Sequence, residues 1–211
     1  MGTKELRNRD NWQTDSGTKA GKAENNFLSV FTKEFSRLEN VNSGFVIEAK
    51  PKELKNIYEN VQLSQEVLKS IYDPKQDNPD KTWKHGIIPD YAIRNSKTGK
   101  TLYIEVKRQD GWVEGKEPKD GRGNAHERSC KFFTPGLLKI LRQHGKLGDD
   151  FLPFWVVFQG DITRDPKRVR EITLWYEKYA EHFFMWYDAA GDEPLIGHFN
   201  QYFRHILLGT E

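Results

Sequence analysis

Three side chains with complementary chemistry lie at strand-like spacing near the middle of the chain: Asp90, Glu105 and Lys107. Residues two apart on a β-strand point to the same face, so Glu105 and Lys107 should lie side by side on a strand expected at 101–107. The apolar stretch at 87–93 and the turn residues after it predict a hairpin with that strand, which places Asp90 beside them. The sequence therefore predicts two carboxylates and an amine that converge.

This combination suits the hydrolysis of a phosphodiester bond. Mg²⁺ prefers hard oxygen ligands such as the carboxylates of Asp90 and Glu105, and the bound ion neutralises phosphate charge and polarises an attacking water. An ammonium group at Lys107 can hydrogen-bond that water and the phosphate, which stabilises the negative charge of the transition state. The plainer alternative is a surface hairpin whose Glu105–Lys107 ion pair contributes about half a kcal/mol. That alternative is weakened because Val106 and its apolar neighbours are typical of a core strand.

Helices and strands that could position these residues follow one another along the chain. Helical spacing of apolar residues, a first-turn proline or a capping residue such as Ser64 or Asp165 predicts the helices. They are expected at 26–39, 51–58, 64–72, 124–133, 137–145, 165–179 and 194–208. Apolar, β-prone runs predict strands at 44–49, 87–93, 101–107, 151–159 and 183–188. This order predicts an α/β fold with a mixed central β-sheet flanked by helices.

The first 24 residues differ in composition from the rest of the chain. Residues 1–24 are polar, include three glycines and lack an apolar period, so we expect a mobile or extended N-terminal arm outside the core. Residues 25–211 are expected to form a single domain. Within it, the glycine-rich and charged stretch at 108–123 predicts a long functional loop.

Composition restricts the class of protein without indicating a function. A length of 211 residues with 36% hydrophobic residues suits a folded domain, and no apolar run reaches the roughly 18 residues of a membrane span. The N-terminus lacks the apolar stretch of a signal peptide, so we expect a cytoplasmic protein. Cys130 is the single cysteine, which excludes an intrachain disulfide and a cysteine-built zinc site. The net charge of +2 does not by itself indicate DNA, because it says nothing about clustering.

Several stretches of the chain resemble a known nuclease family: Pro89–Asp90, 105–112, 121–134 and 154–170. They are similar to the PD-(D/E)xK nuclease superfamily, and more closely to the MunI-type restriction endonucleases, which cut CAATTG. The likeness covers nearly the whole chain and is weakest before residue 26 and at 73–85. Its most specific element is Gly-Asn-Ala-His-Glu-Arg-Ser at 123–129, which looks like the AATT-reading segment of the MunI-type and EcoRI-type enzymes.

The resemblance implies a restriction-endonuclease-like core and a complete active site. Asp90, Glu105 and Lys107 would be catalytic, with Asp90, Glu105 and the backbone carbonyl of Val106 as ligands of Mg²⁺. It also implies cleavage of C/AATTG with 5′-phosphates and AATT overhangs, and a methyltransferase that protects host DNA. With one active site per subunit, a double-strand cut at a palindrome requires a homodimer whose twofold axis matches that of the DNA.

The resemblance also implies how the DNA sequence is read. Arg122 would read the outer G·C pair, supported by Gly123, and a bidentate Arg–guanine pair contributes roughly 1 to 3 kcal/mol of discrimination. Side-chain chemistry agrees for the rest of the segment. Asn124 can pair with adenine, Arg128 can reach a purine, and Ala125 can touch a thymine methyl group.

Other functions remain open at this level. A DNA-repair or junction nuclease with the same core would cut by DNA shape and show little preference among linear duplexes. A non-catalytic sequence-specific DNA-binding protein would tolerate the loss of Asp90, Glu105 and Lys107. The long recognition segment favours the restriction endonuclease, and cleavage on addition of Mg²⁺ to a bound duplex separates it from the binding protein.

Overall fold

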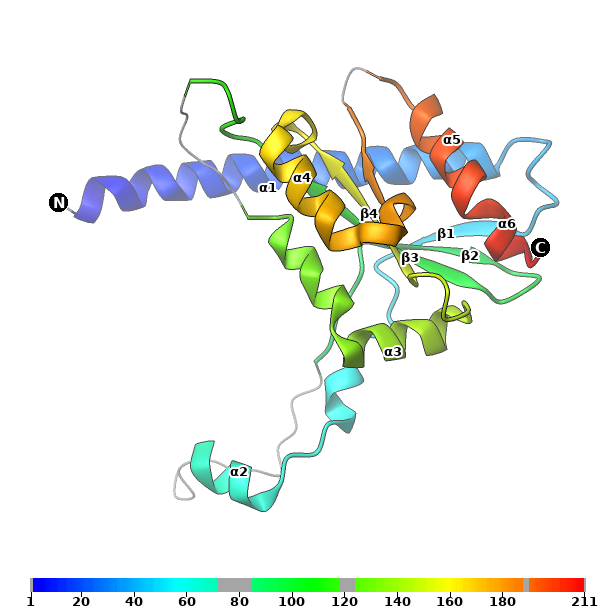
Figure 1. Cartoon of the computed structure of the whole chain (residues 1–211), viewed down its shortest axis with the longest axis horizontal. Helices are drawn as coiled ribbons and strands as arrows, with labels where there is room; N and C mark the ends of the chain where they lie inside the picture. The colour runs from blue at the N-terminus through cyan, green and yellow to red at the C-terminus, as the bar shows by residue number, and fades with distance from the viewer. Residues whose placement is uncertain (1, 72–84, 118–123, 188–189, 211) are drawn as a thin grey trace.

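The computed structural model describes the chain except for residues 1, 72–84, 118–123, 188–189 and 211. At its centre is a five-stranded mixed sheet in the order β1-β2-β3-β4-β5 (Figure 1). β1, β2 and β3 pair antiparallel, whereas β3, β4 and β5 pair parallel. The strands are β1 (Phe45–Ala49), β2 (Tyr91–Asn95), β3 (Thr101–Arg108), β4 (Phe154–Gln159) and β5 (Phe183–Met185). The mixed sheet was therefore predicted correctly, although β2 begins at Tyr91 and not at residue 87.

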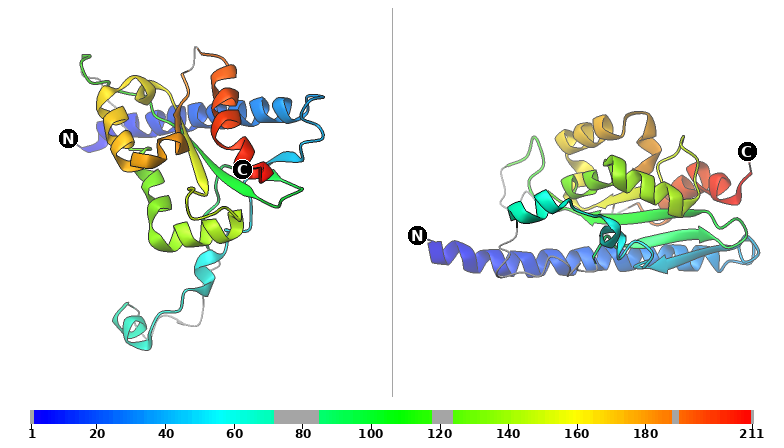
Figure 2. Two further views of the ribbon diagram at one scale, coloured as in Figure 1. Left: turned by 45° about the vertical axis from the view of Figure 1, so that its right-hand side comes forward. Right: turned by 90° about the horizontal axis from the view of Figure 1, so that it is seen from below.

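Helices surround this sheet. The α-helices of the described residues are α1 (Gly2–Phe35), α2 (Gln65–Ile71), α3 (Pro135–Gly145), α4 (Pro166–Tyr176), α5 (Glu193–Tyr202) and α6 (Arg204–Leu208). Shorter 3₁₀ helices lie at Ile57–Asn60, Glu127–Phe133, Asp161–Arg164 and Glu177–His182. Figure 2 shows α1 running along one side of the sheet, with α3 and α4 on the other.

Each face of the sheet has its own apolar core because side chains alternate along every strand. On one face, Trp155 of β4 packs with Phe27 and Phe31 of α1, and α5 and α6 complete this core. On the other face, Phe154 and Phe158 of the same strand pack with residues of α3 and α4. All six residues of β4 are buried, as expected for a strand covered on both faces.

The N-terminal helix differs most from the prediction. A single helix runs from Gly2 to Phe35, so the expectation of a mobile or extended arm at 1–24 is wrong, and Ala23 is buried in the core. The turns anchored by packed side chains such as Phe27 provide a nucleus, and adding further helical residues to a nucleus is much easier than forming one. The sequence lacks an apolar period there because little of this part contacts the sheet: a Cβ at Gly17 or Gly21 would meet no neighbouring atom.

Three helix predictions were only partly correct. Leu38 does not continue the apolar stripe of α1, because the helix ends at Phe35 and Leu38 is 93% exposed. At 51–58 the chain forms turns, with only the 3₁₀ helix Ile57–Asn60 at its end. The expected helix at 194–208 is divided into α5 and α6 at Phe203, whose φ of −118° departs from the roughly −63° of a regular α-helix.

Candidate active site

The β2–β3 hairpin brings Asp90, Glu105 and Lys107 together as predicted. Tyr91 pairs with Ile104, so Asp90, just before β2, lies beside the second half of β3. The backbone N–H of Val106 donates to Asp90 Oδ2 at 2.9 Å. Lys107 Nζ lies 2.6 Å from Glu105 Oε1 and 3.6 Å from Asp90 Oδ2. The three side chains therefore form one cluster at the end of β3.

Burial makes it unfavourable for the two carboxyl groups of this cluster to carry a negative charge. Asp90 and Glu105 are 6% and 7% exposed, and Glu105 Oε2 has no hydrogen-bond partner among the described residues. Burial raises the pKa of the Glu105 carboxyl, Lys107 opposes this rise and Asp90 adds to it. A buried carboxylate oxygen without a partner is unfavourable, and a cation placed there would relieve it.

The donor set fits a hard divalent cation. Asp90 and Glu105 provide carboxylate oxygens, and the carbonyl of Val106, the residue between Glu105 and Lys107, lies 3.4 Å from Lys107 Nζ. No third Asp, Glu, His or Cys joins them to complete a ligand cluster in the part of the chain that the structure describes. Mg²⁺ is usually held by one or two carboxylates and keeps several waters or substrate phosphate oxygens, so this number of protein ligands suits it.

Lys50 is a member of the cluster that the sequence analysis missed. It follows β1, and its Nζ lies 2.6 Å from Asp90 Oδ1 and 3.0 Å from Glu24 Oε2 on α1. Its backbone N–H also donates to the Asp90 carbonyl at 2.9 Å. The sequence carries no signal for this contact, because Lys50 and Asp90 are 40 positions apart and lysine at a strand end is ordinary on a surface.

The predicted recognition segment contacts Gln109, the residue that directly follows β3. Asn124 and Ala125 lie just before the 3₁₀ helix Glu127–Phe133 and Arg128 lies within it, where a helix at 124–133 had been expected. Asn124 and Arg128 are exposed, and Ala125 is half-buried. Arg122 and Gly123 lie outside the described residues. The exposed Asn124 and Arg128 are therefore accessible to a ligand.

His126 anchors this segment to the catalytic strand. It is fully buried and stacks on Trp175 of α4, with 5.5 Å between the ring centroids and 5° between the planes. Its Nδ1 lies 3.0 Å from Oε1 of Gln109, and Gln109 directly follows β3. Burial lowers the pKa of His126 and the nearby Arg168 lowers it further, which favours the neutral ring. The recognition segment is thus tied to a residue two positions beyond Lys107.

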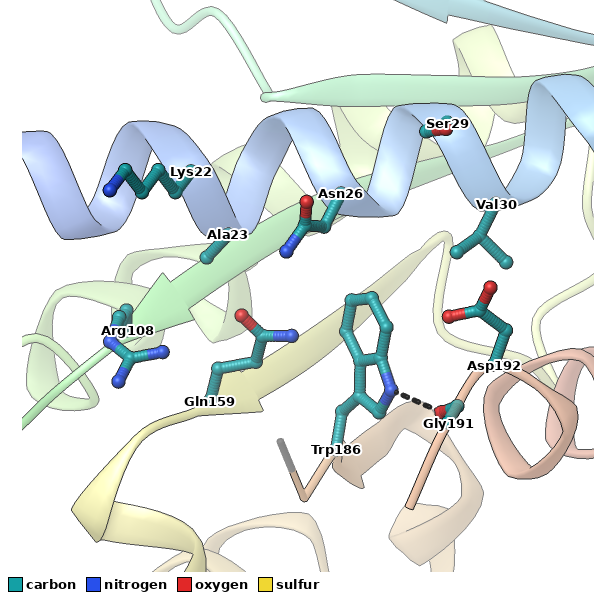
Figure 3. A pocket seen from close by; sticks show the side chains of 10 residues that line it. All are labelled: Lys22, Ala23, Asn26, Ser29, Val30, Arg108, Gln159, Trp186, Gly191 and Asp192. Atoms are coloured by element: carbon teal, nitrogen blue, oxygen red, sulfur yellow. Dashed lines mark hydrogen bonds between the residues drawn. The ribbon is translucent and has the colours of Figure 1, made fainter. Parts of the chain in front are cut away.

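A separate cavity lies on the opposite face of the sheet. This cavity has a volume of about 450 Å³. Figure 3 shows its lining beneath α1, with Lys22 and Asn26 on the helix and Arg108 and Gln159 at the ends of β3 and β4. Arg108 follows Lys107 directly, so the two side chains point to opposite faces of β3. The cavity is therefore distinct from the place where the predicted catalytic side chains meet.

Comparisons with known proteins agree with this geometry. The family model described as "Type II restriction enzyme MunI" matches residues 1–208. The type II restriction enzyme MunI of Mycoplasma sp is 52% identical over 208 residues, which are 98% of this chain and 100% of that protein. This chain belongs to the MunI family of type II restriction enzymes. A crystal structure of MunI restriction endonuclease in complex with cognate DNA matches with a TM-score of 0.72 and 49% identity, covering 93% of this chain and 97% of that one.

Membership of the MunI family confirms three predictions: the resemblance, the restriction-endonuclease-like α/β fold and the class of enzyme. The alternatives of a junction nuclease and of a non-catalytic binding protein are not supported. Type II restriction enzymes generally need a divalent metal, which agrees with the oxygen donors at Asp90 and Glu105. Within the described ranges, no helix combines the length and the apolar character needed to cross a bilayer.

Proposed function

We propose that this MunI-family enzyme hydrolyses both strands of the palindromic site C/AATTG in duplex DNA with Mg²⁺. The products would carry 5′-phosphates and AATT overhangs. The observation that carries the proposal is the convergence of Asp90, Glu105 and Lys107, with a buried and unpartnered oxygen on Glu105. The related MunI structure is described as a complex with cognate DNA, which supports a DNA substrate here.

Asp90, Glu105 and the Val106 carbonyl would hold the Mg²⁺. When bound, the ion supplies a Lewis acid that neutralises charge on the scissile phosphate. Lys107 Nζ, which already contacts both carboxylates, would donate hydrogen bonds to the attacking water and to a phosphate oxygen. The apolar residues of β3 hold these groups rigid, because positions 101–106 of the strand are buried.

Sequence reading would lie in the adjacent segment. Asn124 pairs with adenine, Ala125 touches a thymine methyl group and Arg128 reaches a purine. Arg122 reads the outer G·C pair, and Gly123 lets the backbone approach the DNA. The exposure of Asn124 and Arg128 beside the buried anchor His126 supports this assignment.

The same proposal includes the oligomeric state of the enzyme, its location in the cell and the bounds of its catalytic domain. A homodimer would place two copies of the Asp90 cluster on the two strands of a palindrome. The enzyme would act in the cytoplasm beside a methyltransferase that protects host DNA. Residues 25–211 would form the catalytic domain, and the preceding part of α1 would extend from it as a helical arm.

End mapping of a plasmid digest tests the proposal. Purified protein with Mg²⁺ should cut only at CAATTG and leave four-base AATT 5′ extensions. Cutting at another sequence would overturn the recognition assignment. Intact plasmid under the same conditions, with the protein folded, would overturn the catalytic one.

A further inference from the structure

An alternating row of charges runs through the site. Glu24 contacts Lys50, Lys50 contacts Asp90, Asp90 contacts Lys107, and Lys107 contacts Glu105. The four N–O distances along this row are 3.0, 2.6, 3.6 and 2.6 Å. The row contains three carboxylates and two ammonium groups, so it has a net charge of −1 when all are ionised.

Lys50 and Lys107 contact different carboxylate oxygens of Asp90. Val106 N and Lys107 Nζ lie on Oδ2, whereas Lys50 Nζ lies on Oδ1. A metal ion ligated by Asp90 needs a carboxylate oxygen that is not held by a cation. Because Lys50 lies on Oδ1, its ammonium group competes directly with an incoming ion.

The backbone of Lys50 holds it in this position under strain. Its φ of +50° is in the left-handed region, which disfavours residues with a Cβ, and Pro51 follows it. The Lys50 N–H bond to the Asp90 carbonyl maintains this conformation. Such strain persists where the surroundings impose it, often at functional sites. The Lys50 side chain is nevertheless 52% exposed, so its ammonium group has room to move while its backbone stays in place.

Resting on the metal site of the proposed function, we propose that Lys50 is a tethered cation that exchanges with the metal ion at Asp90. Glu24, already 3.0 Å away, receives the ammonium group when the ion takes Asp90 Oδ1. Lys50 is thus a positioning residue that keeps Asp90 neutralised and oriented in the absence of metal. Glu24 sets how readily Lys50 leaves.

Mn²⁺ binding to the whole protein without DNA tests this exchange, because Mn²⁺ takes the same oxygen ligands and its free form is counted by electron paramagnetic resonance. Lys50→Met removes the competing charge and should tighten Mn²⁺ binding about tenfold, the size expected for one unit charge near a divalent ion in solvent-like surroundings. Glu24→Gln removes the acceptor and should weaken binding several-fold. The double variant should behave like Lys50→Met, because Glu24 acts through Lys50.

Lys52→Met and Glu39→Gln are matched controls, since both residues are exposed and neither contacts the row of charges. Their Mn²⁺ affinities should equal that of the unaltered chain. Lys50→Arg keeps the positive charge and should not tighten Mn²⁺ binding. This variant tests the role of the charge even if Lys50→Met fails to fold.

Unchanged or weaker Mn²⁺ binding in Lys50→Met, with Asp90→Ala still abolishing binding, would overturn the exchange and leave the metal site standing. Binding that survives Asp90→Ala would overturn the metal site as well, and so would an unaltered chain that binds no Mn²⁺. Tighter binding in Lys50→Met, weaker binding in Glu24→Gln and a double variant that binds like Lys50→Met would support the exchange. Independent effects of the two charges on the ion would instead add in the double variant, and that result would overturn the exchange.

Discussion

His182 makes the stability of the fold depend on pH. This residue ends the 3₁₀ helix Glu177–His182 and is fully buried. Its Nδ1 lies 2.9 Å from the carbonyl of Phe154, and its Nε2 accepts from the N–H of Leu152 at 3.4 Å. The imidazole is therefore neutral, with the proton on Nδ1. Burial lowers the pKa of His182 from 6.5 to about 4.

This lowered pKa fixes the sign of the effect. Between pH 6.5 and about 4 the unfolded chain binds a proton at His182 that the folded chain does not bind. The free energy of unfolding should therefore be highest above pH 6.5 and fall as the pH decreases toward 4. At about 1.4 kcal/mol per pKa unit, His182 accounts for a loss of roughly 3 kcal/mol across that window.

Urea unfolding at several pH values and one protein concentration measures this loss. His182→Gln should lower stability at pH 7 but remove roughly 3 kcal/mol from the fall between pH 6.5 and 4. His205→Gln is the control, because His205 is exposed and its loss should leave the pH profile unchanged. If His182→Gln kept the full pH dependence of the unaltered chain, the reasoning from burial would be refuted.

Three further predictions concern recognition and the loop beside the site. Arg122→Ala should reduce discrimination at the outer base pair by about ten- to a hundredfold, measured by cleavage of duplexes that differ only there. His126→Ala should weaken cognate binding about tenfold in fluorescence anisotropy without Mg²⁺, while non-specific affinity holds, because it releases the segment from Gln109 and Trp175. Gly160→Ala should cost at least about 2 kcal/mol in urea unfolding, since φ is +86° and the new Cβ would lie 2.8 Å from a backbone oxygen.

Features set by neighbouring residues were predictable from the sequence. The hairpin that joins Asp90 to Glu105 follows from alternation and turn residues. Two helix starts were also predicted from local chemistry: Ser64 Oγ accepts from Val67 N, and the Asp165 side chain accepts from Lys167 N. These contacts span two or three positions, so the sequence records them directly.

Features that depend on distant residues were missed. The contact between Lys50 and Asp90 joins segments 40 positions apart, and the residue type gives no sign of it. The helix through Gly17 and Gly21 is supported by the packing of Phe27 further along α1, whereas local propensity alone argued against it. The helix expected at 26–39 includes Leu38 because its spacing fits the apolar residues before it, but α1 ends at Phe35 and Leu38 is exposed.

The most direct test of the account is Mg²⁺ added to preformed complexes with a CAATTG duplex. Lys107→Ala should still fold and bind the duplex, yet cleave at least about a hundredfold more slowly than the unaltered chain. Lys139→Ala, a change at an exposed lysine on α3, should cleave at the normal rate. Cleavage by Lys107→Ala at the rate of the unaltered chain would contradict the assignment of the Asp90, Glu105 and Lys107 cluster as the active site.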